Sequence, residues 1–269
     1  MHARHRTTLA AAVLLGLAPT IAVAAEEDTP FTVRLGAMYV DGSGDIEGRT
    51  NALGQDFAFT EDFDFGSREV VPRVDGQFRF GGRSRIVFNY FEYDKDNRQT
   101  LSEAISFDDV TIPAGSFAET QAEFQLASIA YDFAVIETDT ASLGLQVGAE
   151  YAKLEGRLIA EAGADRYDET ATEDGYAPLV GIRYTATPGD AWRVVAQAQY
   201  FDSEWGDFGD VEGDVTRANA LVEYRFNPTF GLFAGYDWFE IDARESGSDG
   251  SLRLKQRFHG PIAGVSLSF

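Results

Sequence analysis

Hydrophobic and polar residues alternate along most of the chain. In the segments 192–200, 218–226 and 230–238, every second residue is apolar over about nine residues. A period of two is typical of β-strands, because successive side chains of a strand point to opposite faces of its sheet. The pattern predicts an all-β protein whose strands each present one apolar face.

The apolar faces of these strands begin and end with aromatic residues. Trp192 and Tyr200 bound the first face, and Phe230 and Trp238 bound the third. A tilted strand crosses the hydrocarbon of a bilayer in about 9–11 residues, and Tyr and Trp are favoured at the lipid headgroups. A soluble β-sandwich also alternates, but it has no reason to repeat aromatic ends at this spacing. The pattern therefore favours a transmembrane β-barrel.

Short and long connections alternate between the predicted strands. Four connections are short, at 81–83, 135–140, 187–190 and 227–228. Outer-membrane barrels have short periplasmic turns and longer extracellular loops, so both termini are expected on the periplasmic side. The five remaining connections are predicted to be acidic extracellular loops near 41–68, 95–118, 156–173, 203–213 and 243–251.

The fold predicted from this layout is an antiparallel up-and-down barrel of about ten strands. Eight strands would require one predicted hairpin to be wrong, and twelve would require a further hairpin inside the first loop. The ten predicted strands lie near 31–40, 69–80, 84–94, 119–134, 141–155, 174–186, 191–202, 214–226, 229–242 and 252–269.

The first residues have the layout of a secretory signal peptide. Arg4 and Arg6 precede a short apolar run at 9–17, which is followed by small residues suited to a signal peptidase. The run is shorter than the ~20 residues that a membrane-spanning helix needs. We expect residues 1–25 to be removed as a signal peptide, leaving 26–269 as the barrel.

Composition narrows the class further. The chain has no cysteine, which removes a lipoprotein acylation site, and it carries 22 Lys and Arg against 44 Asp and Glu. Loss of Arg4 and Arg6 with the signal leaves 20 − 44 = −24. Nucleic acid is therefore not expected as a partner, because phosphate binding needs a basic surface. The 21 Phe, 11 Tyr and 3 Trp argue against an acidic disordered chain.

The carboxyl terminus ends a strand on an aromatic residue. Phe269, Leu267 and Val265 share one face of the last strand. This ending resembles the terminal signature of Gram-negative outer-membrane β-barrel proteins, although Leu267 stands where Tyr is frequent. The resemblance identifies no subfamily. It implies location in the outer membrane of a Gram-negative bacterium, contact with outer-membrane lipid and lipopolysaccharide, and recognition of these three residues by the barrel-assembly machinery.

The faces opposite the apolar ones are expected to fill the barrel. Their charged residues have both signs in similar number, and charges enclosed with little water must be paired or hydrogen-bonded. Barrels of eight to ten strands are largely filled by side chains, so a wide pore is not expected. The predicted lumen network comprises Arg73, Asp75, Arg79, Arg85, Asp132, Glu150, Arg183, Arg193, Glu223, Arg225 and Asp237.

Three functions stay open on the sequence. The first is a non-enzymatic surface or structural protein, and the second is a narrow channel or porin-like transporter of small solutes. The third is a lipid-active barrel enzyme. His259 is the one histidine left after signal removal, and no Asp-x-His pair occurs, so no catalytic residue is predicted. A monomer is expected by analogy, because trimeric porins usually have more strands.

Cofactor and metal chemistry have weak support in the sequence. No phosphate loop, dinucleotide fingerprint or zinc spacing occurs, so no cofactor is expected. Loop carboxylates could hold divalent cations. The segments 41–45 and 207–214 nevertheless lack the glycine that a calcium loop requires at its sixth position, and no defined metal site is predicted.

Overall fold

The structure is a computed structural model that describes most of the chain beyond the amino terminus. The predicted signal peptide, residues 1–25, lies outside the described residues. Among the described residues, no helix is long and apolar enough to cross a membrane. The described residues are 30–52, 55–64, 68–100, 105–107, 110–112, 117–162, 165–206, 212–246 and 250–269.

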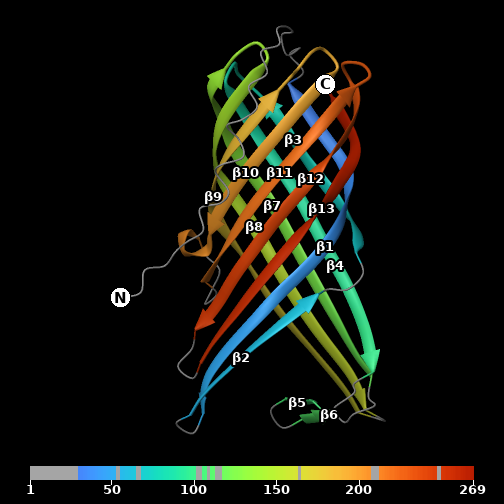
Figure 1. The fold of residues 1–269 in the computed structure, drawn as a ribbon, viewed down its shortest axis with the longest axis vertical. Helices are drawn as coiled ribbons and strands as arrows, with labels where there is room; N and C mark the ends of the chain where they lie inside the picture. Colours follow the sequence, from blue (N-terminus) through green and yellow to red (C-terminus); the bar gives the residue numbers. More distant parts are fainter. Residues whose placement is uncertain are drawn as a thin grey trace.

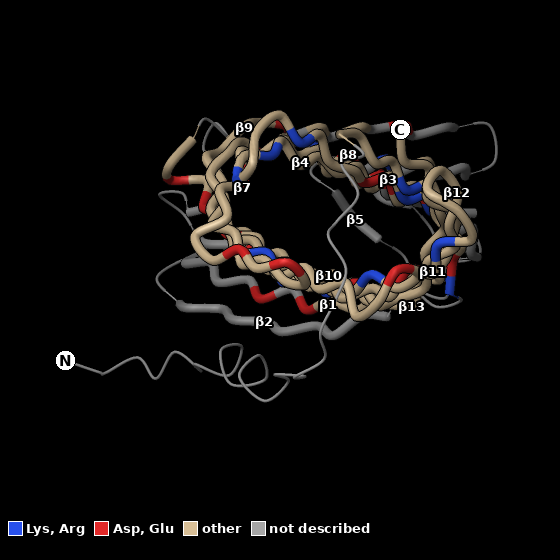
Figure 2. Tube along the Cα trace, turned by 90° about the horizontal axis from the view of Figure 1, so that it is seen from above, with Lys and Arg blue, Asp and Glu red and all other residues tan. Residues whose placement is uncertain are grey.

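Ten strands form one closed antiparallel barrel, as the sequence predicts (Figures 1 and 2). Neighbours in the barrel follow chain order, and β13 pairs with β1 to close it. Viewed along its length, the barrel is an oval ring. The strands are β1 (Phe31–Ala52), β3 (Glu69–Arg79), β4 (Ser84–Thr100), β7 (Phe117–Glu137), β8 (Ala141–Ala162), β9 (Asp165–Ala186), β10 (Trp192–Asp202), β11 (Glu212–Arg225), β12 (Phe230–Ser246) and β13 (Gly250–Ser268).

The first predicted loop contains a further strand, β2 (Gln55–Asp64), but it does not enlarge the barrel. β2 pairs with residues 43–52 of β1, and β3 pairs with residues 31–40 along the same edge. β2 and β3 are therefore the outer and inner parts of one barrel position. A small hairpin, β5 (Ile105–Phe107) and β6 (Val110–Ile112), lies within the second predicted loop.

The predicted loops are too long, because strands continue through much of them. β8 and β9 pair from Ala141↔Ala186 out to Ala162↔Asp165, across the whole segment expected as a loop at 156–173. The outer ends form two groups in Figure 1, with β12, β13, β1 and β2 on one side and β4, β7, β8 and β9 on the other. Pairing continues there because antiparallel hydrogen bonds need no apolar face, whereas the sequence pattern reports only apolar faces.

The short turns lie at the opposite end of the barrel, together with both ends of the described barrel. Backbone hydrogen bonds join Phe31 and Phe269 in both directions, at 3.0 and 2.9 Å. The turn between β9 and β10 places Gly189 at φ +94°, a conformation that glycine adopts without steric cost. This end is uppermost in Figure 1.

Two girdles of outward-facing aromatic side chains bound an apolar band on the outside of the barrel. Leu35, Ile129, Leu145, Val222 and Val265 are among the exposed apolar side chains of the band. Such a band between aromatic girdles is the lipid contact surface of an outer-membrane barrel. The girdle near the turns includes Phe80, Phe133, Trp192, Phe226 and Phe230, and the girdle farther along the strands includes Tyr39, Tyr176, Trp205 and Tyr236.

Candidate functional site

The lumen is the candidate site, and its part toward the short turns is a buried network of charged side chains. Arg34 on β1 donates from Nε to Glu223 on β11 at 2.9 Å and from Nη1 to Asp75 on β3 at 3.0 Å. Arg193 on β10 lies 3.8 Å from the second oxygen of Glu223. Arg34, Glu223 and Arg193 have at most 1% of their side chains exposed. Arg34 and Glu223 join strands that are not neighbours in the barrel, whereas Arg34–Asp75 and Arg193–Glu223 join neighbouring strands.

A second cluster centres on Asp237 of β12. Arg73 donates from Nε to its Oδ2 atom at 3.0 Å, and Arg217 donates from Nη2 to the same atom at 2.8 Å. Arg217 also donates to Asn89, which in turn donates to Ser128. One carboxylate thus holds guanidinium groups from β3 and β11, with a hydrogen-bonded chain leading to β7.

A third cluster lies near the turns. Arg85 is 3.8 Å from Asp132 and donates to the Ser142 hydroxyl at 3.1 Å. Gln146 donates to the other Asp132 oxygen at 3.1 Å. A Cβ atom added at Gly144 would lie 2.4 Å from Asp132 Oδ1, so this glycine leaves the space that the buried carboxylate occupies.

The eleven predicted lumen residues lie in three different situations. Eight of them are buried inside the barrel, and Asp75 is partly exposed. Arg79 and Arg225 lie at the rim, where they donate to turn carbonyls of Gly82 and Asp190. Among the described residues, Glu150 Oε1 has no hydrogen-bond partner. The eight buried residues are Arg73, Arg85, Asp132, Glu150, Arg183, Arg193, Glu223 and Asp237.

Sequence reasoning missed Arg34 and Arg217, which are 1% and 3% exposed. Both lie at positions whose side chains point into the barrel. Arg34 is next to the lipid-facing Leu35, and Arg217 is two residues from Asn219, which is on the inward face. The alternation that located the other arginines was therefore also present at these two positions.

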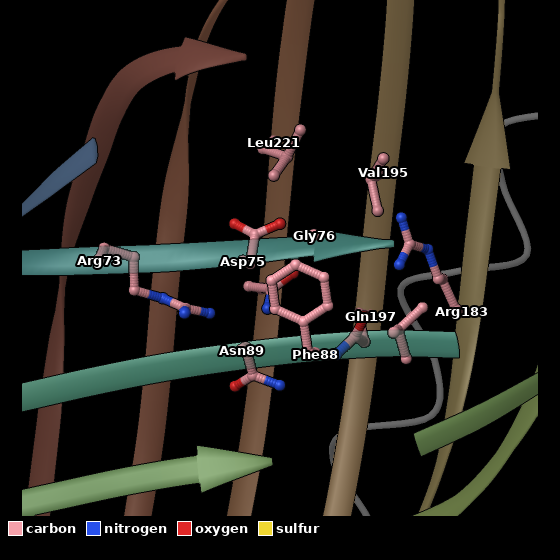
Figure 3. A pocket seen from close by; sticks show the side chains of 11 residues that line it. Arg73, Asp75, Gly76, Phe88, Asn89, Arg183, Val195, Gln197 and Leu221 are labelled. Carbon is pink, nitrogen blue, oxygen red and sulfur yellow. The ribbon is translucent and has the colours of Figure 1, made fainter. Parts of the chain in front are cut away.

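The centre of the network leaves a void of about 10 Å³, of the order of one water molecule. Figure 3 shows Arg73 and Asp75 of β3, Asn89 of β4, Arg183 of β9 and Gln197 of β10 around it. Arg183 donates to the Gln77 carboxamide at 2.9 Å rather than to a carboxylate. The void offers water-sized space within the network and is not a passage for solutes.

Beyond the charged clusters, a plug of aromatic side chains fills the barrel. Phe91, Phe239 and Phe258 are at most 1% exposed, and Phe124 is 5% exposed. The rings of Phe91 and Phe239 meet edge to face at 4.6 Å, and those of Phe239 and Phe258 stack at 5.0 Å. Phe124 stacks on Phe258 at 5.7 Å. The four rings come from β4, β7, β12 and β13 and close the lumen near the outer girdle.

On the outer side of this plug the lumen contains an apolar cavity of about 130 Å³. Phe124 lies at its floor, and Asp214 and Lys153 lie among its lining residues. Its exposed walls are almost entirely apolar. The lining apolar side chains are Ala152 and Leu154 of β8, Phe201 of β10, Val215 of β11, Ile241 and Ala243 of β12, and Leu254 of β13.

Ion pairs cover the outer surface of β12 and β13 beyond the outer girdle. Arg253 donates to both oxygens of Asp242, at 2.9 and 2.5 Å, and Arg257 donates to Glu240 at 2.6 Å. Partial burial raises the pKa of Asp242, but the hydrogen bond and charge of Arg253 outweigh burial and hold that pKa below its usual 3.8. The hydrogen bond to Asp242 likewise raises the pKa of Arg253.

His259 lies on the outside of the barrel, as its parity with Pro261 predicts. Its Nδ1 atom is 2.8 Å from the Tyr236 hydroxyl, and the two rings stack at 6.2 Å. It pairs with Trp238 across the β12–β13 ladder. Within the described part of the chain, no group of three or more His, Asp or Glu side chains lies together as a candidate metal centre.

Comparisons with known proteins show which solved structures have a similar fold. The sequence matches no known protein family and no curated protein. Among solved structures, the chain is similar to the outer-membrane protease OmpT from Escherichia coli, with a TM-score of 0.56, 10% identity, and coverage of 90% of this chain and 98% of that chain. At this identity the likeness shows the fold and not the activity.

Two autotransporter barrels are similar at lower scores. One is the translocator domain of NalP from Neisseria meningitidis, with a TM-score of 0.44, 10% identity, and coverage of 91% of this chain and 90% of that chain. The other is the transport unit of AIDA-I from Escherichia coli, with a TM-score of 0.39, 10% identity, and coverage of 93% and 94%.

The closed ten-stranded barrel, its apolar band and its aromatic girdles define the class. The protein is a transmembrane β-barrel of the Gram-negative outer-membrane type, and the outer membrane is its location. A likeness at 10% identity shows the fold alone, and a fold of this kind by itself assigns no activity.

Proposed function

We propose that the protein is a non-enzymatic surface protein whose membrane-spanning lumen is a closed structural core. The observation that carries the proposal is the double filling of the lumen. Six buried arginines and their partners occupy the part toward the short turns, and the aromatic plug of Phe91, Phe124, Phe239 and Phe258 fills the part toward the outer girdle. A solute would have to displace both fillings to pass, and so a conducting path is not expected in the folded state.

The surface role rests on the length of strand beyond the membrane. From Tyr151, near the outer girdle, β8 continues for 162 − 151 = 11 residues to Ala162. At ~3.3 Å per residue this is about 36 Å of strand. The rigid core would hold these paired outer ends at the cell surface. With no partner residue needed to close the lumen, a monomer is the proposed state.

Lipopolysaccharide is the proposed neighbour of the outer surface of β12 and β13. Arg244, Arg253, Lys255 and Arg257 lie there beyond Trp238, where lipid phosphates meet an outer-membrane barrel. Their carboxylate partners Asp242 and Glu240 orient the basic groups, and phosphate oxygens could share the remaining N–H donors.

Planar-bilayer conductance tests the closed lumen. The mature chain, folded in detergent and shown by its gel shift on boiling to be a barrel, should give no discrete current steps. A trimeric porin prepared in the same detergent is the positive control. Reproducible steps from the folded protein would refute the closed lumen and favour the narrow channel. Hydrolysis of lipid or peptide by the folded chain, lost in His259→Ala, would instead favour an enzyme.

A further inference from the structure

The apolar cavity at the outer end of the lumen has the properties of a small-molecule site. It has a floor, Phe124, and its walls come from β8, β10, β11, β12 and β13. The side chains of Phe124, Phe201 and Val215 are at most 6% exposed, so packing fixes them in place. Apart from Ser203, the described lining residues belong to strands and not to loops.

We propose that this cavity binds one uncharged, apolar molecule about the size of a single six-membered ring, taken up from outside the cell. An apolar protein cavity of about 150 Å³ stays dry and binds benzene, and the cavity here is about 130 Å³. Ligand sites of this kind are concave and mostly apolar. The size selects against whole lipids and the wall chemistry selects against sugars and peptides.

The charges of the segments that form the cavity disfavour acids, such as fatty acids, as the preferred ligand. Asp214, at an outward-facing position of β11, is among the lining residues, Glu204 is exposed in the connection between β10 and β11, and Glu212 is exposed at the start of β11. Lys153, a basic residue at the lining, is paired with Glu155 at 2.9 Å and Glu123 at 3.3 Å. An incoming carboxylate would therefore meet repulsion without a cation that is free to bind it.

Polar ligands would find few partners, because Ser203 and Gln256 are the uncharged polar side chains among the described lining residues. The Ser203 hydroxyl at the edge of the cavity accepts the Gly213 N–H at 2.6 Å. A polar ligand would lose its hydrogen bonds to water against the apolar walls and gain few in exchange. The inference rests on the closed lumen proposed above, because the floor formed by Phe124 belongs to the aromatic plug.

Nuclear Overhauser effects between benzene and labelled methyl groups test the site directly. The mature protein in lipid nanodiscs would carry ¹³C-labelled Ile and Leu methyls. We expect contacts from benzene to Ile241, Leu154 and Leu254 that saturate as benzene is added. Leu145 and Leu232 face the lipid and report benzene dissolved in the bilayer. Equal, non-saturating contacts at cavity and lipid methyls would overturn the proposal.

A matched pair of variants on β8 separates the cavity from the lipid. Ala152→Phe places a ring in the cavity and should weaken the saturable binding by about tenfold or more. Ala149→Phe faces the lipid on the same strand and should bind as the wild type does. Ala243→Phe fills the cavity from β12 and repeats the test if Ala152→Phe does not fold. Folded filling variants with wild-type binding would refute the site.

The two proposals fail in different ways. Current steps in the bilayer with saturable contacts at Ile241 would refute the closed lumen and leave the ligand site standing. A silent bilayer without saturable contacts would refute the ligand site alone.

Discussion

Arg34 and Glu223 are 189 positions apart in the sequence and form a buried ion pair of 2.9 Å across the lumen. Their strands, β1 and β11, are separated in the barrel by β12 and β13, so the pair is a crosslink through the interior and not along the sheet. Asp75 holds the other side of the Arg34 guanidinium at 3.0 Å. The charged lumen thus ties together strands that backbone hydrogen bonds do not join.

Removal of Arg34 should strongly destabilise the barrel. Arg34→Met keeps an unbranched side chain but leaves Glu223 and Asp75 without this partner inside the lumen. Breaking one partner of a buried pair costs about 3–5 kcal/mol, and we expect a loss of that order in the free energy of unfolding, measured by urea titration in lipid vesicles.

The matched control for Arg34→Met is Arg257→Met on the outer surface. Arg257 pairs with Glu240 at 2.6 Å, but 47% of its side chain is exposed. Exposed pairs contribute about 0–1 kcal/mol, so this variant should unfold almost as the wild type does. Similar losses in the two variants would mean that the lumenal pair is no more important than a surface pair.

The aromatic plug should behave as a packed core and not as a gate. Phe239 is fully buried and contacts Phe91, Phe124 and Phe258. Phe239→Ala should lower the free energy of unfolding by about 3–5 kcal/mol because it leaves a cavity. No current steps should appear in the planar bilayer, because the charged clusters still fill the lumen on the side of the short turns.

Phe239→Leu separates the contribution of Phe239 to packing from any role in closing the lumen. It leaves a smaller cavity than the alanine variant and should cost correspondingly less stability. Urea unfolding and conductance of the same samples check both statements. Current steps from Phe239→Ala with unchanged stability would identify the ring as a gate.

The pair of Asp242 and Arg253 should make the outer part of β12 and β13 sensitive to acid. Because the pKa of Asp242 lies below its usual 3.8 in the folded protein, the pair contributes its full stability above that value. The contribution is lost as the pH falls through the lowered pKa. Exposure to solvent limits it to about 1 kcal/mol.

The free energies of unfolding of the wild type and of Asp242→Asn, measured at neutral and at low pH, test this direction. The wild type should be more stable at pH ~7, and the difference should shrink as the pH falls through the lowered pKa of Asp242, below which the carboxyl is protonated in both states. Arg253→Met should show the same difference and the same loss at low pH. A difference that grows as the pH falls would contradict the assigned direction.

The barrel could be predicted from the sequence because its lipid-facing side chains alternate with inward ones, as from Trp192 to Tyr200. The alternation also indicates which charged side chains point into the barrel, including that of Arg34. It cannot give the pairing, because Arg34 and Glu223 meet only through the curvature of the closed sheet. The aromatic plug was not predicted either. Phe91, Phe239 and Phe258 face inward, where the alternating pattern predicts polar residues, so these three apolar residues only weaken the alternation.

The predicted loop lengths show the limit of the same pattern. Outside the membrane, neither face of a strand needs to be apolar, so the period of two weakens while backbone pairing continues. β8 and β9 remain paired as far as Ala162 and Asp165 for this reason. The cavity lies in this outer region, and because its lining comes from six strands, no single segment of the sequence indicates it.

The carboxyl-terminal aromatic should matter for assembly more than for stability. Phe269 is 64% exposed, and its ring lies 5.1 Å from that of Phe31. Its two backbone hydrogen bonds to Phe31 do not depend on the side chain. Phe269→Ala should therefore keep most of the stability of the folded barrel while removing the ring that, with Leu267 and Val265, is expected to be recognised by the assembly machinery.

The prediction is checked by the rate at which the heat-shifted form appears on a gel, with and without the reconstituted barrel-assembly machinery. Phe269→Ala should slow assembly by the machinery and change spontaneous folding into thin bilayers much less. Phe226→Ala is the matched control, because Phe226 is 61% exposed in the same girdle but lies far from the terminus. Both variants remove one exposed ring at the same end of the barrel. If Phe226→Ala slows machinery-dependent assembly equally, the machinery recognises the girdle and not the terminal strand.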